Sequence, residues 1–272
     1  MSMELVATLA FYLGALGYTV AAALFFVDLA RPEDTSQSGA WAPRVLLLGG
    51  AFHLLHIVVS SLLTQICPVE TLHFGLSFSA FVAVAAYGLL YRRAKLYATG
   101  AIVAPVALTF LVLAQFVTSG DPQPLAPLLM FHIAANVLGI GLFLFAGASG
   151  LLYLFQEHRL RRKQTGGISQ KLPSLDSLDR TTHLLLLAGF PLLTFGVVTG
   201  AVFAKRLFGF EGAELARSLL GYATWAVLAS VLILRRVAGV RGRRAAYGTL
   251  AGLLCVLLVI VVYAARPGGR PS

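Results

Sequence analysis

Eight long apolar stretches, separated by short polar segments, account for most of this chain. Each is roughly 20 residues or more, the length that a helix needs to cross a hydrocarbon core about 30 Å thick. We expect spans at about Leu5–Leu29, Pro43–Ile66, Leu72–Tyr91, Ala98–Val117, Pro127–Gln156, Thr182–Ala204, Leu215–Leu234 and Ala245–Ala265. Lipid offers the backbone no hydrogen-bond partners, and the alternation typical of barrel strands is absent. The pattern therefore predicts an all-α, polytopic membrane protein of about eight transmembrane helices.

The composition agrees with this interpretation. The 272 residues are 58% hydrophobic and 12% charged, about half the charged fraction of a soluble domain. A net charge of +10 would point to nucleic acid in a soluble protein. Here the basic residues lie in the short loops between apolar stretches, which is the topology signal of a membrane protein. We therefore expect a lipid bilayer and no nucleic acid as the surroundings of this chain.

The charged loops alternate along the chain and predict its orientation. The third, fifth and seventh loops carry Arg92, Arg93, Lys95, Arg159, Arg161, Arg162, Lys163, Lys171, Arg180, Arg235, Arg236, Arg241, Arg243 and Arg244. The second and fourth loops, at 67–71 and 118–126, contain no Lys or Arg. Since basic loops stay in the cytoplasm, we expect both termini on the non-cytoplasmic side. We also expect one membrane domain, 1–272, in which a cytoplasmic loop at 157–181 separates a five-helix half, 1–156, from a three-helix half, 182–272.

Four histidines are expected near the outer leaflet. His53 and His56 share one face of the second span, His73 opens the third, and His132 lies near the outer end of the fifth, one turn before Asn136. Neutral imidazole is a good ligand for iron, and two axial histidines from different helices can hold a haem. Each histidine also has a structural interpretation, because His53 and His56 can hydrogen-bond between helices and His73 lies where the membrane meets water.

Small residues in the sixth span predict close helix packing. Gly196 and Gly200 are four residues apart and let another helix approach. Pro191, inside the same span, predicts a kink. A tight helix pair explains these residues without a ligand.

Several ordered segments resemble a known family. They are the fifth span with His132 and its Tyr153–Glu157 end, the segment Leu172–Asp179, and above all Gly189–Ala204, which looks like "GFPLLTxGxxxGAxWA". A weaker similarity in Pro68–Phe78 falls where a "PxxxxYES"-like segment is usual. The chain thus resembles the cytochrome c assembly proteins, which include CcsA-type haem-handling proteins and HemX-like proteins. CcsA-type members present haem at the outer face for attachment to apocytochrome c, and the resemblance makes His132 an external axial ligand.

The chain also departs from the CcsA-type pattern. After Ala204 it has Lys205–Gly212 in place of the tryptophan-rich "WDPKE" loop. The "YLHxR" end of the next span appears as Leu232–Arg236 without its histidine, and no histidine follows the last span. The "YES" position reads His73–Gly75. In lacking these features the chain resembles the HemX-like branch of the family.

These observations lead to one expectation and one alternative. The expectation is a haem-handling protein of the bacterial inner membrane that takes part in cytochrome c maturation. It would bind haem b, with His132 as one iron ligand and His73, His56 or His53 as the second, and would work with another assembly subunit. The alternative is a HemX-like regulator or scaffold that binds a haem-biosynthesis enzyme through its basic loops. We expect no independent enzymatic activity, since no nucleophile set, phosphate loop or paired carboxylates are evident.

Overall fold

The computed structural model describes residues 2–31, 41–65, 72–92, 96–116, 127–203 and 212–264. Its helices are α1 (Met3–Ala30), α2 (Ala42–Thr64), α3 (Leu72–Leu90), η3 (Tyr97–Thr99), α4 (Gly100–Phe116), α5 (Pro127–Arg161), α6 (Ile168–Lys171), α7 (Leu175–Phe203), α8 (Gly212–Val237) and α9 (Arg243–Ala264). Within these residues all regular structure is helical, and eight helices are long and apolar enough to cross a membrane. The prediction of an all-α, multi-pass membrane protein is confirmed.

Two helices extend further than the hydropathy pattern predicted. α5 continues past Gln156 to Arg161, and α7 begins at Leu175 rather than near Thr182. The extra turn of α5 carries the Glu157–Arg161 ion pair, which spans one helical turn. α7 begins early because the Ser174 hydroxyl accepts a hydrogen bond from Ser177 N. Much of the loop predicted at 157–181 is therefore helical, since hydropathy reports depth in lipid and not helix length.

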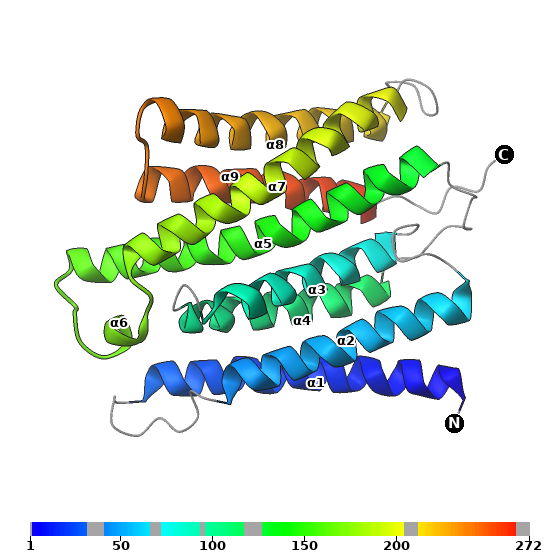
Figure 1. Ribbon diagram of the computed structural model, residues 1–272, viewed down its shortest axis with the longest axis horizontal. Helices are drawn as coiled ribbons and strands as arrows, with labels where there is room; N and C mark the ends of the chain where they lie inside the picture. The colour runs from blue at the N-terminus through cyan, green and yellow to red at the C-terminus, as the bar shows by residue number, and fades with distance from the viewer. Residues whose placement is uncertain are drawn as a thin grey trace.

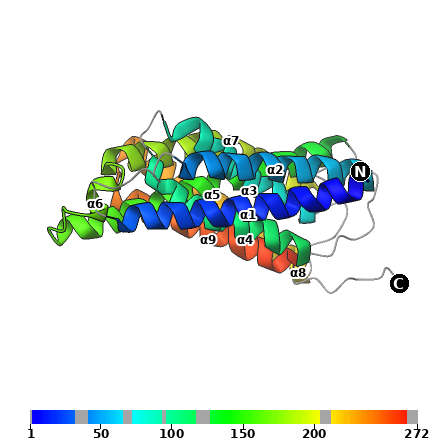
Figure 2. The same ribbon diagram turned by 90° about the horizontal axis from the view of Figure 1, so that it is seen from below.

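The long helices lie side by side along one axis, with α1 and α2 at one edge and α8 and α9 at the other (Figure 1). Figure 2 shows the same bundle from below, with α6 at one end. We call this the α6 end. It also holds the end of α3 and the α8–α9 turn, while α1, α3 and α5 begin at the opposite end, the far end. Arg92, the end of α5 and the α8–α9 turn thus bring the basic segments to one end. Which end faces the cytoplasm stays a prediction.

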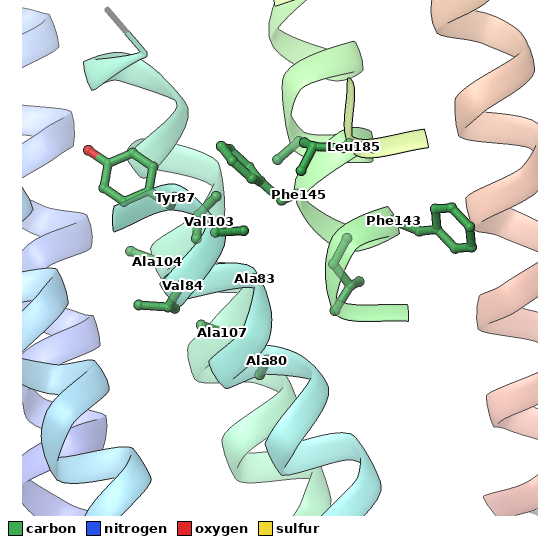
Figure 3. Close-up of a cluster of buried hydrophobic side chains, with 14 of the residues drawn as sticks. Ala80, Ala83, Val84, Tyr87, Val103, Ala104, Ala107, Phe143, Phe145 and Leu185 are labelled. Atoms are coloured by element: carbon green, nitrogen blue, oxygen red, sulfur yellow. The ribbon is translucent and has the colours of Figure 1, made fainter. Parts of the chain in front are cut away.

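The centre of the bundle is built from small side chains on α3 and α4. Ala80, Ala83 and Val84 of α3 meet Val103, Ala104 and Ala107 of α4, while Phe145 approaches from α5 (Figure 3). Alanine allows neighbouring helices in a membrane to approach closely. α5 packs against α3 on one side and against α7 and α9 on the other. The division into two halves at 156 stays a prediction, and α5 belongs to the packing of both.

A buried ionic contact ties the α5–α7 connection to the first helix. Lys171, at the end of α6, donates a hydrogen bond of 2.5 Å to the Asp28 carbonyl, and its Nζ lies 3.9 Å from Asp28 Oδ1. Both side chains are mostly shielded from solvent. Leu172 and Ser169 of the same connection are also buried. The connection is thus packed onto the α6 end of the bundle.

Candidate functional site

His132 lies in the seam between α5 and α7. Its Nδ1 is 2.7 Å from the Thr199 hydroxyl, which itself donates to the Phe195 carbonyl at 2.6 Å. When the Thr199 hydroxyl donates to the Phe195 carbonyl, it accepts from His132, and Nδ1 is the protonated nitrogen of the neutral ring. In that tautomer Nε2 carries the lone pair, and it is the nitrogen that a metal binds.

Two glycines of α7, Gly196 and Gly200, make room for polar side chains of α5. A Cβ at Gly200 would lie 3.1 Å from His132 Cε1, and a Cβ at Gly196 would lie 2.6 Å from Asn136 Nδ2. Asn136 Nδ2 donates a hydrogen bond of 2.8 Å to the His132 carbonyl and lies 3.4 Å from His132 Nε2. The predicted close packing thus has a specific use, because the glycine spacing on α7 matches the spacing of His132 and Asn136 on α5.

His53 is enclosed by three helices. Its Nδ1 is 2.9 Å from the Tyr18 hydroxyl of α1, and its Nε2 is 2.7 Å from the Ser77 hydroxyl of α3. The side chain is fully buried. Because both ring nitrogens are engaged, this arrangement favours the structural role of His53 as a link between α1, α2 and α3. A ligand role would require one of these bonds to break.

His56 and His73 share a different arrangement. His56 Nδ1 lies 3.0 Å from the Ala7 carbonyl of α1, and His73 Nδ1 lies 2.6 Å from the Ala114 carbonyl of α4. A carbonyl oxygen can only accept, so Nδ1 carries the proton in both rings and Nε2 carries the lone pair. Metal-binding histidines are commonly fixed in this way, with the other ring nitrogen donating to a backbone carbonyl.

The four predicted residues do not form one compact cluster. His132 faces α7, His53 and His56 contact α1, and His73 contacts α4. His56 is within electrostatic range of both His53 and His73. Among the described residues, no group of three or more His, Cys, Asp or Glu side chains is arranged to hold a metal ion. A haem needs one or two axial ligands from the protein, and the assignment of these ligands stays a prediction.

Sequence reasoning did not identify the partners of these histidines. Tyr18, Ser77 and Thr199 lie 35, 24 and 67 residues from the histidines they contact. Nothing in the sequence pattern distinguishes Tyr18 and Ser77 from the other residues of their apolar stretches. Thr199 gave the clearest signal, because it lies between the two glycines in the segment that carried the family resemblance.

The chain is thus a multi-pass membrane protein in which buried histidines bridge neighbouring helices towards the far end. Residues 50–265 match the family model described as Cytochrome C assembly protein. The chain belongs to the cytochrome c assembly protein family, as its resemblance predicted.

Named relatives in this family fall into two groups. The cytochrome c biogenesis protein CcsA of Guillardia theta is 26% identical over 212 residues, which cover 70% of each chain. CcsA of Gloeothece citriformis is 24% identical over 241 residues, covering 70% of this chain and 74% of the relative. Protein HemX of Bacillus subtilis is 23% identical over 256 residues, covering 90% of each chain.

The departures from the CcsA-type pattern fall in different places. The segment 204–211, where the tryptophan-rich loop is expected, lies outside the described residues, as do 66–71 and 265–272. At the end of α8, Arg235 forms two hydrogen bonds with the Asp179 carboxylate, of 2.9 and 2.7 Å. The helix end at which the resemblance led us to expect a histidine is therefore used here for an ion pair with α7.

Proposed function

We propose that this protein binds haem at the far end of its helix bundle and handles it during cytochrome c maturation in the bacterial inner membrane. Membership of the cytochrome c assembly family supports the role in maturation. The single observation that carries the site is the state of His132, whose Nδ1 is fixed by Thr199. In the tautomer with the proton on Nδ1, this bond orients the imidazole with Nε2 as its metal-binding nitrogen.

The donor chemistry fits haem. Neutral imidazole with a fixed Nδ1–H is the usual axial ligand of haem iron in proteins. Haem is the group that is to be attached to an apocytochrome, and the residues of this chain would bind and orient it. Neither Cys67 nor Cys255 belongs to a CxxCH motif, so covalent attachment of a c-type haem to this chain is not expected. The proposed cofactor is therefore haem b.

The second ligand is best sought in His73 or His56. Both donate through Nδ1 to a backbone carbonyl and keep the Nε2 lone pair. His53 is disfavoured, because both of its nitrogens already bond to Tyr18 and Ser77. His73 also lies at the very start of α3, where a ligand entering from the far end arrives first.

The test is the haem absorption of the purified full-length protein, produced in cells supplied with haem precursor. We expect a Soret band in the wild type and a haem content at least about tenfold lower in His132→Ala, because an axial ligand is lost. His158→Ala is the matched control, since His158 is exposed near the α6 end, and it should keep its haem. Wild-type protein that is haem-free under these conditions would overturn the proposal.

Replacing His73 and His56 one at a time identifies the second ligand. We expect one of the two alanine variants to shift the Soret maximum, while the other leaves it unchanged. If both spectra match the wild type while His53→Ala alters it, the order of preference given above is wrong.

The similarity to HemX covers 90% of each chain and favours a second function. In that function the protein is a scaffold for a haem-biosynthesis enzyme. The basic side chains suited to such contact are Arg162 and Lys163, which are exposed. Arg159 already donates a hydrogen bond to Ser169, and Arg161 donates one to Glu157. A soluble tetrapyrrole enzyme that co-purifies with the wild type, and is lost in R162Q/K163Q, would support this function. Haem-loaded protein without such a companion would argue against it.

A further inference from the structure

A basic cavity lies at the α6 end, between the start of α7 and the α8–α9 turn. Its volume is about 520 Å³, and its lining includes Arg180, His183, Arg236 and Arg241 together with Asp176, Asp179 and Arg235. The cavity is at the opposite end of the bundle from His132. It therefore belongs to neither the haem site proposed above nor its histidines.

Of the two carboxylates in this cavity, Asp179 is already used for structure. Asp179 accepts both hydrogen bonds of Arg235, and its Oδ1 also accepts one of 2.9 Å from Gly242 N. Gly242 has a φ of +66°, which suits the tight turn that brings its amide to Asp179. Asp179 and Arg235 therefore neutralise each other and brace the α8–α9 turn against α7.

The remaining cationic groups keep their charge available. Within the described part of the chain, Arg180, Arg236 and Arg241 make no ion pair, and all three are exposed. His183 adds a ring nitrogen, Nδ1, that is buried without a hydrogen-bond partner among the described residues. These three guanidinium groups outnumber the one remaining carboxylate, the exposed Asp176, so the cavity keeps an excess of positive charge. Guanidinium matches the oxygens of a phosphate particularly well.

The surroundings indicate that the anion comes from the membrane. Val237, directly after Arg236, is 81% exposed, and Leu184, directly after His183, is 51% exposed. Exposed apolar side chains next to the cavity are expected where acyl chains meet headgroups. A soluble anion would gain nothing from them, whereas a lipid would bury its chains on them.

We propose that this cavity binds the phosphate of an anionic phospholipid headgroup, held by Arg180, Arg236 and Arg241, with its acyl chains along α7 and α8. Here the cations line a cavity in which Arg235 neutralises Asp179 and three further arginines outnumber Asp176. Basic pockets between transmembrane helices recognise such headgroups.

The test compares lipid binding to the purified full-length protein in detergent, by native mass spectrometry. Dioleoyl phosphatidylglycerol is the anionic probe and dioleoyl phosphatidylcholine the zwitterionic one. We expect a preference for the glycerol lipid that falls about tenfold or more in R236Q/R241Q, because two phosphate-binding cations are removed. R162Q/K163Q removes the same charge from exposed positions outside the cavity, and should keep the preference within about twofold.

Three results would overturn the proposal: equal binding of both lipids by the wild type, an equal loss in both double variants, and displacement of the lipid by millimolar glycerol phosphate alone. The last result would assign the cavity to a soluble phosphate compound. Circular dichroism checks that each variant is folded. If R236Q/R241Q does not fold, Arg236→Gln alone serves, since this exposed side chain makes no ion pair with described residues. A folded R236Q/R241Q that keeps the wild-type lipid preference would overturn the proposal as well. Haem content should be unchanged in every variant, because the cavity lies at the opposite end of the bundle from His132.

Discussion

At the residue scale, the four histidines towards the far end differ in how their ring nitrogens are used. His56 and His73 donate through Nδ1 to backbone carbonyls, which leaves Nε2 as the basic nitrogen, and His132 has its Nδ1 bonded to the Thr199 hydroxyl. His53 has both nitrogens bonded to hydroxyls and is fully buried. Residues of one type therefore differ in their capacity to bind a metal. Burial alone does not separate them, since His56 is also buried.

Replacing His53 with alanine should destabilise the protein rather than abolish a ligand site. The change leaves a cavity and strands the hydroxyls of Tyr18 and Ser77, so we expect the free energy of unfolding to fall by about 2–4 kcal/mol. Denaturation of the purified protein in detergent measures this loss. Haem bound per folded molecule should equal that of the wild type. Loss of haem with unchanged stability would show that His53 is a ligand and not a link between helices.

At the element scale, the seam between α5 and α7 is the feature that joins packing to chemistry. Along α7, Gly196, Thr199 and Gly200 face the polar pair on α5. The glycines admit the side chains of Asn136 and His132, and the threonine orients the imidazole. The same spacing that brings two membrane helices together also forms the support for a ligand. α7 stays helical through Pro191.

Gly196→Ala should disturb this seam. The added methyl group would overlap the Asn136 amide, so we expect a loss of about 1–3 kcal/mol in unfolding free energy from overpacking and a lower haem content. Gly221→Ala is the matched control, because a Cβ there meets nothing within 4 Å. It should be neutral or stabilising by up to about 1 kcal/mol. A Gly196 variant that behaves like the Gly221 variant would show that the seam can open without cost.

At the scale of the whole molecule, the pattern of apolar stretches predicted the architecture well. Lipid allows a single solution for a backbone in each long apolar stretch, so eight stretches give eight helices. The site was less predictable, because partners such as Tyr18 for His53 and Thr199 for His132 come from other helices. Apolar periodicity places a residue in depth but does not say which neighbour it faces. The Asp179–Arg235 pair was missed for the same reason.

The predicted orientation can be tested with single cysteines. With Cys67 and Cys255 replaced by alanine, Gly166→Cys lies in the α5–α7 connection, where a side chain meets nothing within 4 Å. Because this connection is at the basic end, we expect an impermeant thiol reagent to label it only after the cells are permeabilised. Ser2→Cys, at the opposite end, should be labelled in intact cells. The reverse labelling pattern would place the histidines on the cytoplasmic side.

The contact between Asp28 and Lys171 has a consequence for biosynthesis. Asp28 lies in the last turn of α1, and its cationic partner is made 143 residues later. The neighbours on which α1 packs, α2 and α4, are both made before Lys171. The contact between α1 and the α5–α7 connection can therefore form only after α5 has been made. It joins the α6 end of the bundle late in synthesis, once the packing partners of α1 already exist.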